Sequence, residues 1–368
     1  MPDRITAFKS DLPYRAVAFL TKGNPLATAL VYFAISYLGL HLVICCSDGL
    51  QAIRNTPRHL LILNNIVLGL LGPLGAAVLC HLYRTIRTSF ASLGEGHVIP
   101  AAELQSYWRL LRGLEKAYNN RYGTVLAVLV GLGFSVYNYF SKPGTWLGVG
   151  GGVGAVYARV FIAVNVYIIC VVVYKCAVTA WGIGKILRLR IDVQPMHPDR
   201  CGGLRPIGQL SLAINYFVVI VMVYFALVFI FDPLPRQQPF YLVLYLIFYF
   251  LGPWLVYACL APANKRMSER KDQARARLNR TFAAYYERIA GGDNQETFKM
   301  EAAGSIPALY DLYRIVDRMP VWPFDLASMT RFAITYALPF ILFLADGLTN
   351  RDSVIFRVGK LIVDAQTF

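Results

Sequence analysis

The chain has 368 residues, of which 57% are hydrophobic and 15% are charged, and its mean hydropathy is +0.48. A soluble domain usually has about 45–50% apolar and about 25% charged residues, so the composition excludes an ordinary water-soluble fold and favours an integral membrane protein. The formal net charge of +15 suits either nucleic acid or an anionic membrane surface.

Seven apolar runs follow one another along the chain, each close to the roughly 20 residues that cross a bilayer as a helix. They lie at 26–46, 60–81, 123–140, 154–180, 211–232, 239–261 and 327–345. The seventh contains Arg331 and Pro339, so it either crosses the membrane or re-enters it. The first run is too long for a cleavable signal, so we expect it to be retained. The predicted fold class is all-α, a polytopic transmembrane helical bundle of six to seven spans.

The basic residues are concentrated in alternate connections between these runs. Of the 36 Lys and Arg residues, 26 lie in 1–25, 82–122, 181–210 and 262–326. This asymmetry places those four segments in the cytoplasm, which predicts a cytoplasmic amino terminus in a bacterial-type inner (plasma) membrane. Because the basic residues flank the spans, we expect them to meet anionic lipid headgroups and not nucleic acid. The seven cysteines include no C-x-x-C pair, which argues against a disulfide framework.

Three stretches outside the apolar runs have helical periodicity and predict a small cytoplasmic helical subdomain. They are 101–118, 264–289 and 306–319, and the second is expected to continue the sixth span out of the membrane as one helix. An alternative is that some of these helices lie on the membrane surface, or that 264–319 binds a partner protein. The expected organisation is an N-terminus (1–25), a bundle (26–261), cytoplasmic amphipathic helices (262–326) and a last span or re-entrant segment with its tail (327–368).

The stretch QPMHPDRCGGLRPIG at 194–208 is the strongest candidate for a site outside the membrane. Its candidate residues are His197, Asp199, Arg200, Cys201, Gly202, Gly203 and Arg205. One interpretation is a structured elbow between the fourth and fifth spans, in which Asp199 binds backbone amides two residues further on and the glycines take positive φ. Another is a site for a ligand or anion, and a third is a metal or catalytic site. A tetrahedral zinc site needs about four ligands, so we expect no metal. We assign no catalytic residue in this loop.

Several polar and small residues inside the spans are further candidates. Gly150 and Gly154 form a G-x-x-x-G pair that predicts close helix packing. Arg159, Asn165, Lys175 and Asn215 are intramembrane polar residues. Arg159 and Lys175 are expected to snorkel towards opposite headgroups, whereas Asn165 must bond a neighbouring helix or face water.

No acidic residue lies deep in the first six runs, which disfavours a proton-coupled carrier. His41 and His81 fall at different depths, so we expect no haem and no other cofactor.

The function that these features favour is a non-enzymatic oligomeric channel or a membrane sensor or effector. Its cytoplasmic helices and the 194–208 loop would regulate it, and a homo-oligomer is expected. A second hypothesis is a membrane enzyme that acts on a lipid or lipid-linked substrate, with His197, Asp199 and Cys201 at the headgroup level. A third is a scaffold for a partner protein.

Overall fold

The structure is a computed structural model that describes residues 12–47, 49–54, 57–95, 98–141, 153–193, 197, 199, 201–231, 239–290, 296–323 and 326–349. Within these ranges all regular structure is helical. Three of the predicted elements can be compared directly with it. The stretch 101–118 is a helix, the sixth apolar run and its basic continuation form one helix of 52 residues, and the last predicted cytoplasmic helix begins ten residues earlier than expected, at Glu296.

The elements are, in chain order, α1 (Leu12–Thr21), α2 (Pro25–Phe33), η2 (Ala34–Gly39), α3 (Leu40–Ser47), α4 (Gly49–Arg54), α5 (Arg58–Ile66), η3 (Val67–Leu71), α6 (Gly72–Glu95), α7 (Ala101–Tyr118), α8 (Arg121–Ser141), α9 (Val153–Ile186), α10 (Arg205–Phe231), α12 (Pro239–Ala290), α13 (Glu296–Asp317) and α14 (Leu326–Thr349). The two elements labelled η are π-helical turns inside otherwise α-helical spans.

Five helices in the described residues are long and apolar enough to cross a membrane. They are Pro25–Ser47, Arg58–Glu95, Val156–Ile186, Arg205–Phe231 and Val243–Glu287. An all-α membrane bundle is therefore confirmed. The third and seventh apolar runs fold as α8 and α14. Within the described residues, neither helix is among the five candidate spans, and α14 contains a shorter apolar helix, Met329–Leu342. The count of six to seven spans stays a prediction.

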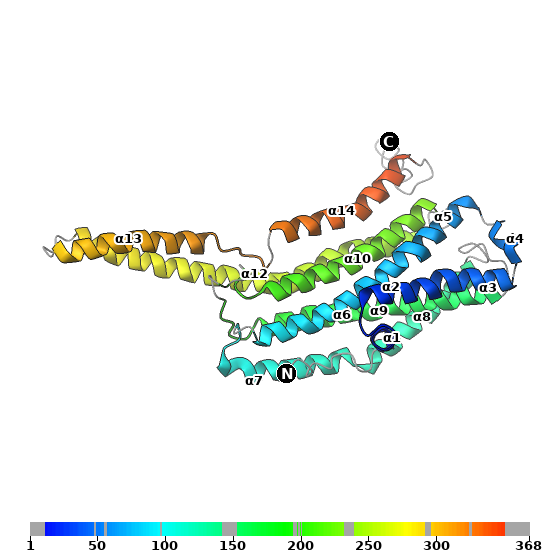
Figure 1. The fold of residues 1–368 in the computed structure, drawn as a ribbon, viewed down its shortest axis with the longest axis horizontal. Coiled ribbons are helices and arrows are strands. Elements are labelled where there is room, and N and C mark those ends of the chain that lie inside the picture. Colours follow the sequence, from blue (N-terminus) through cyan, green and yellow to red (C-terminus); the bar gives the residue numbers. More distant parts are fainter. Residues whose placement is uncertain are drawn as a thin grey trace, which may run out of the picture.

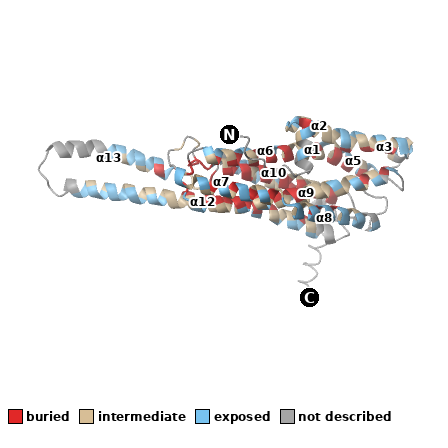
Figure 2. Cartoon of the chain, turned by 90° about the horizontal axis from the view of Figure 1, so that it is seen from below, coloured by how far each residue is buried: buried red, intermediate tan, exposed pale blue. Residues whose placement is uncertain are grey.

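The central helix of the bundle is α10, which packs against α6, α12 and α14 (Figure 1). In its most apolar stretch 67% of the residues are buried by protein, against 17–33% in the other four candidate spans. Most side chains of those four spans are therefore partly or fully exposed, and lipid would surround the exposed ones. Figure 2 shows the buried residues gathered along the axis of the bundle, with exposed residues on its outside.

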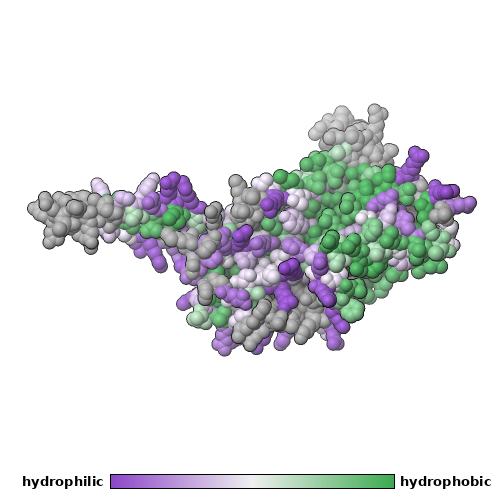
Figure 3. Space-filling model, in the orientation of Figure 1, coloured by the Kyte–Doolittle hydropathy of each residue, from purple (hydrophilic) through white to green (hydrophobic). Residues whose placement is uncertain are grey.

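The two ends of the molecule differ in shape and polarity. At one end the long helix α12 leaves the bundle and pairs with α13, so that the two helices form a projecting hairpin (Figure 1). The helix α4 lies at the opposite end. Figure 3 shows an apolar surface over much of the bundle on the side of α4, and a hydrophilic surface towards the hairpin. This polarity is that of a protein whose apolar bundle crosses a bilayer and whose hairpin lies in water.

Candidate functional site

The carboxylate of Asp199 organises the loop between α9 and α10. It accepts hydrogen bonds from the backbone N–H groups of Cys201 (2.9 Å), Gly203 (3.0 Å) and Arg205 (3.3 Å). Its Oδ1 also lies 2.8 Å from Nδ1 of His197. Burial by itself would raise the pKa of Asp199, but these hydrogen bonds stabilise the charged form and bring the pKa below its ordinary value. Asp199 therefore acts as an anionic cap at the beginning of α10.

Two glycines let this loop turn tightly against the connection that follows α6. Gly202 and Gly203 have φ values of +66° and +89°, a region that favours glycine. A Cβ at Gly203 would lie 2.3 Å from Cγ2 of Val98, a residue that is 2% exposed. The carbonyl of Val98 in turn accepts a hydrogen bond from the backbone N–H of Asp192 (2.8 Å). The loop is thus packed onto the 82–122 connection, as a structural elbow requires.

The arrangement of the remaining loop residues does not resemble a metal or nucleophile site. Cys201 is buried, with 3% exposure, and the Asp199 carboxylate is occupied by backbone donors. Over the part of the chain that the structure describes, no group of three His, Cys, Asp or Glu side chains could hold a metal ion. Arg200 lies outside the described residues, and Arg205 is exposed at the first turn of α10.

Lys175 is buried within the bundle, so the expectation that it snorkels to a headgroup is wrong. Its side chain is 3% exposed, and Nζ donates to the carbonyl of Tyr118 (3.2 Å) while lying 6.0 Å from the centre of the Tyr118 ring. Tyr118 is the last residue of α7, and the carboxyl end of a helix carries partial negative charge. The carbonyl end of α7 therefore supplies a hydrogen-bond acceptor for the buried Lys175 ammonium.

The other intramembrane polar residues have different environments. Asn215 is fully buried in α10, and neither of its side-chain polar atoms has a hydrogen-bond partner among the described residues. Arg159 is half-buried, and its carbonyl accepts from the hydroxyl of Ser135 (3.0 Å). Asn165 lines a cavity between helices of the bundle.

The proposed glycine pair for helix packing is only partly described. Gly154 is buried in the first turn of α9, and Gly150 lies outside the described residues. A closer helix contact occurs at Gly131 of α8, where a Cβ would lie 2.7 Å from the carbonyl oxygen of Ala163 in α9. The sequence signal for that contact is weak, because Gly131 and its neighbour Gly133 do not have the G-x-x-x-G spacing.

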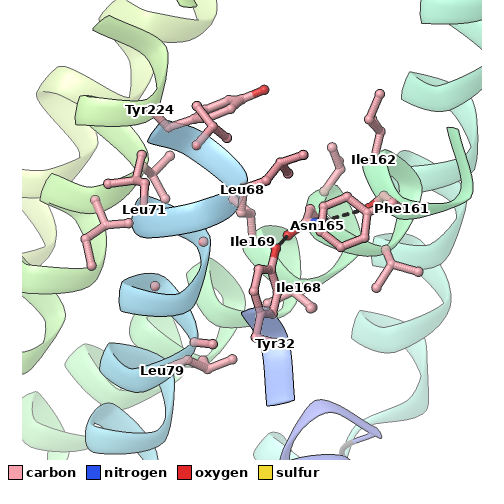
Figure 4. A pocket seen from close by; sticks show the side chains of 18 of the residues that line it. Tyr32, Leu68, Leu71, Leu79, Phe161, Ile162, Asn165, Ile168, Ile169 and Tyr224 are labelled. Atoms are coloured by element: carbon pink, nitrogen blue, oxygen red, sulfur yellow. Dashed lines mark hydrogen bonds between the residues drawn. The ribbon is translucent and has the colours of Figure 1, made fainter. Parts of the chain in front are cut away.

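A cavity of about 690 Å³ lies among α2, η2, η3, α6, α9 and α10 (Figure 4) and opens partly to the outside of the bundle, where Ile35, Val160 and Val164 of its lining are exposed. This size is typical of pockets that hold a small organic ligand. The wall is formed mainly by apolar side chains from separate elements, for example Leu68 and Leu71 of η3, Leu79 of α6, Phe161 and Ile168 of α9, and Phe225 of α10. Among the described residues that line the cavity, none carries a charged side chain. The space therefore suits an uncharged lipophilic molecule.

Tyr32 and Asn165 form a hydrogen-bonded polar pair in this mainly apolar wall, which also includes the hydroxyls of Thr21, Thr28, Tyr157 and Tyr224. The hydroxyl of Tyr32 donates to Oδ1 of Asn165 (2.6 Å), and Nδ2 of Asn165 donates to the carbonyl of Phe161 (2.8 Å). The carbonyl of Phe161 can only accept, which fixes the orientation of the Asn165 amide and makes Tyr32 the donor. Figure 4 shows both hydrogen bonds at the edge of the cavity. The Tyr32 ring packs closely against α6 at Gly72, where a Cβ would lie 2.5 Å from Cε1 of the ring.

The two π-helical turns lie beside each other at this cavity. Ile35 of η2 and Leu68 of η3 both line it. The hydroxyl of Ser36 donates to the carbonyl of Leu68 (3.2 Å), and the hydroxyl of Tyr157 donates to the carbonyl of Ile35 (2.6 Å). A π-helical turn widens a helix and occurs frequently at functional sites. Here the widened turns help to shape the wall of the cavity.

A group of basic side chains on α12 joins the hairpin to the bundle. Arg266 donates to the carbonyls of Leu187 (2.9 Å) and Arg188 (3.4 Å), directly after the end of α9. Lys271 donates to the carbonyls of Asp317 (2.7 Å) and Met319 (2.9 Å), at the end of α13. Positive side chains at the carboxyl ends of helices are stabilised by the helix dipole. We call Arg266 and Lys271, with the four carbonyls they bind, the α12 junction.

Of the candidate residues, the structure brings His197, Asp199 and the two glycines together in one elbow, and it places Asn165 in the cavity. Lys175 and Asn215 lie elsewhere in the bundle, and neither is among the residues that line the cavity. Comparison with known protein families, with curated proteins and with solved structures finds no match to this chain.

Proposed function

We propose that the protein is a non-enzymatic membrane sensor or effector. It binds a lipophilic molecule in the cavity and responds through the α12–α13 hairpin. The observation that carries this proposal is the cavity itself, a space of about 690 Å³ with a mainly apolar wall that contains the hydrogen-bonded Tyr32–Asn165 pair. An apolar space of this size that opens partly to the outside of the bundle can admit a lipophilic molecule from the surrounding membrane.

Two helices that line the cavity continue to the end of the molecule that bears the hairpin. The helix α9 contributes Phe161 and Asn165 to the cavity, and the carbonyls just beyond its end bind Arg266 at the α12 junction. The helix α6 contributes Ala76 to the cavity, and its Ser89 hydroxyl donates to the carbonyl of Pro206 in α10 (3.0 Å). A change in the spacing of the cavity walls would thus reach the hairpin through rigid helices.

The hairpin supports an output through a partner protein. Large side chains on it are exposed, including Tyr286 (73%), Tyr310 (61%) and Ile315 (44%). Tyrosine is enriched at protein–protein interfaces, so the two exposed tyrosines are suitable contacts for a partner. In this proposal the protein lies in a bacterial-type inner membrane, with the hairpin in the cytoplasm. It is a homo-oligomer, in which the outer faces of the bundle helices contact other copies.

The sensor form is favoured over the channel form because of the chemistry of the cavity wall. A conducting path needs polar or charged groups to replace the hydration of an ion, whereas this wall is apolar. The enzyme hypothesis is weakened by the burial of Cys201 and by the backbone donors that occupy Asp199.

The test uses spin labels on non-natural amino acids at Gln105 of α7 and Tyr286 of α12, which leaves the native cysteines in place. Delipidated protein in detergent is titrated with hexadecanol, and the distance between the labels is measured by pulsed electron paramagnetic resonance. We expect the distance distribution to change in the wild type.

The matched variants are Ala76→Phe, which places a ring in the cavity, and Ala77→Phe, one residue further on, where the side chain is not among those lining it. Ala77→Phe should respond as the wild type does, and Ala76→Phe should not respond. A wild-type distribution that does not change when hexadecanol is bound, or the same response in both variants, would contradict the proposal.

A further inference from the structure

We infer that the occupant of the cavity is an uncharged lipophile with a single hydroxyl or carbonyl group, which Tyr32 and Asn165 recognise. This inference rests on the proposed function and names the class of ligand at that same site. It depends on two properties of the cavity, the absence of charge in its described wall and the hydrogen-bonding capacity that remains at the polar pair.

The wall excludes a ligand whose buried part is charged. A charge moved into an apolar site needs a counter-charge or several hydrogen bonds, and among the described lining residues there is no Lys, Arg, Asp or Glu. The hydroxyl proton of Tyr157 is already used, because it donates to the carbonyl of Ile35 (2.6 Å), so Tyr157 has no proton left to donate to a ligand. The hydroxyl of Thr28 lies 2.8 Å from that of Thr21 and also donates to the carbonyl of Asn24 (2.8 Å).

The polar pair retains the capacity for one further partner. An asparagine amide has two N–H protons and its oxygen has two lone pairs. The bonds to Tyr32 and Phe161 use one of each. The phenol oxygen of Tyr32 donates its proton to Asn165 and can still accept. A hydroxyl of the ligand can therefore donate to Tyr32 and accept from Asn165, and a carbonyl can accept from Asn165.

The pair is accessible from the cavity and held in place by its surroundings. Tyr32 and Asn165 both line the cavity and both keep partial exposure. The Tyr32 ring packs against the ring of Phe161, with ring centroids 5.8 Å apart, and also packs closely against Gly72. Because the two polar side chains come from α2 and α9, a ligand that binds them bridges the first span to the fourth.

The chain offers a matched control for this pair. Tyr37 of η2 donates to Oδ1 of Asn65 in α5 (3.1 Å) and so forms a second tyrosine–asparagine bond, which joins the first predicted span to the second. Neither Tyr37 nor Asn65 lines the cavity. Asn65→Leu thus removes the same kind of hydrogen bond as Asn165→Leu, without changing the cavity wall.

The experiment compares three photoreactive probes of equal chain length: hexadecanol, hexadecylamine and hexadecane, each with a diazirine at the same carbon. The full chain is labelled in nanodiscs, and the cross-linked peptides are identified by mass spectrometry. We expect the alcohol to label peptides from α2 and α9 in the wild type, more strongly than the amine or the hydrocarbon.

Asn165→Leu and Tyr32→Phe should each reduce labelling by the alcohol about fivefold, which is the effect of one lost hydrogen bond. The hydrocarbon should be unaffected by either change, and Asn65→Leu should behave as the wild type. Tyr32→Phe keeps the aromatic ring, so it tests the inference even if Asn165→Leu does not fold.

Two different failures can be told apart. Equal labelling of the cavity by all three probes, with no effect of Asn165→Leu or Tyr32→Phe, would overturn the ligand class but leave a lipophile site in place. Labelling of neither helix by any probe would overturn the proposed function as well. Analysis of the lipid extracted from the purified protein then shows the source of the ligand. An alcohol or ketone in the extract comes from the host membrane, and its absence means that the site binds only an added alcohol or ketone. Both results are consistent with an uncharged lipophile that has one hydroxyl or carbonyl group.

Discussion

Asp199 shows how one side chain can organise a connection between two spans. Its carboxylate receives three backbone N–H groups, from Cys201, Gly203 and Arg205. Hydrogen bonds to a charged group contribute more than those between neutral groups. The glycines that follow allow these donors to point inward at one carboxylate.

We predict that Asp199→Asn lowers the free energy of unfolding by about 1.5–3 kcal/mol at neutral pH, because the charged acceptor is lost. The pKa of Asp199 is lowered in the folded protein. The stability that this group contributes is therefore present above its ordinary pKa of about 4 and is lost as the pH falls through the folded value. Thermal unfolding of the detergent-solubilised protein should show a gap between the wild type and the variant that narrows in acid.

Asp192→Asn is the control for that measurement. Asp192 is in the same connection and forms an exposed ion pair with Arg270 at 2.9 Å. Exposed pairs contribute little to stability, so this variant should unfold close to the wild type. An equal loss in both variants, or a gap at Asp199 that does not depend on pH, would contradict the capping role.

At the scale of the elements, α8 and α9 are held together by close backbone approach. A Cβ at Gly131 would lie 2.7 Å from the carbonyl oxygen of Ala163, whereas a Cβ at Gly133 meets no atom within 4 Å. We predict that Gly131→Ala lowers the free energy of unfolding by about 1–3 kcal/mol through overpacking. Gly133→Ala should be neutral or stabilising by up to about 1 kcal/mol, because alanine favours the helix.

Thermal unfolding of the two alanine variants in the same detergent provides the comparison. If both change the unfolding temperature in the same direction and by the same amount, the close approach of α8 to α9 at Gly131 does not contribute to stability.

The hairpin should depend on the α12 junction. Lys271 binds two carbonyls at the end of α13, so Lys271→Ala leaves that end with fewer partners. We predict that amide hydrogen exchange at residues 312–319 accelerates about fivefold, the effect of one lost hydrogen bond on local opening. Arg277→Ala, at an exposed position on the same helix, should leave this exchange unchanged. Equal rates in the wild type and Lys271→Ala would show that the junction does not hold the hairpin.

Elements were more predictable from the sequence than the candidate site was. The apolar runs and the helical periodicity of 101–118 and 264–289 correctly predicted helices, because both signals depend on residues that are close together in the sequence. The cavity pair could not be predicted, since Tyr32 and Asn165 are 133 positions apart and meet only through packing. The environment of Lys175 was missed for the same reason, because its partner is the carboxyl end of another helix, at Tyr118. Asp199 was accessible to prediction because its partners lie within six residues.

At the scale of the whole molecule, contacts between distant segments gather the basic connections at one end. Ser89 of α6 binds the carbonyl of Pro206 (3.0 Å), and Arg270 of α12 binds Asp192 (2.9 Å). The segments 82–122, 181–210 and 262–326 thus meet one another, at the opposite end from α4 (Figure 1). This is the arrangement expected when basic connections share one side of a membrane.

We therefore predict that cysteines introduced at Gln105 and Tyr286 are labelled from the same side of the membrane, and that one at Gln51 in α4 is labelled from the other. All three positions are exposed. A membrane-impermeant maleimide applied to right-side-out and inside-out vesicles gives the measurement, with the unsubstituted protein as the background for its native cysteines. Labelling of positions 105 and 286 from opposite sides would contradict this topology.

The most direct test of a lipophile bound between Tyr32 and Asn165 is a cryo-electron microscopy map of the protein in nanodiscs, compared with a map of Ala76→Phe. We predict elongated density in the wild-type cavity, with one end within hydrogen-bond distance of the Tyr32–Asn165 pair, and loss of that density in the variant. A wild-type map in which the side chains of α2, α6, α9 and α10 close the space, with no density between them, would contradict the account.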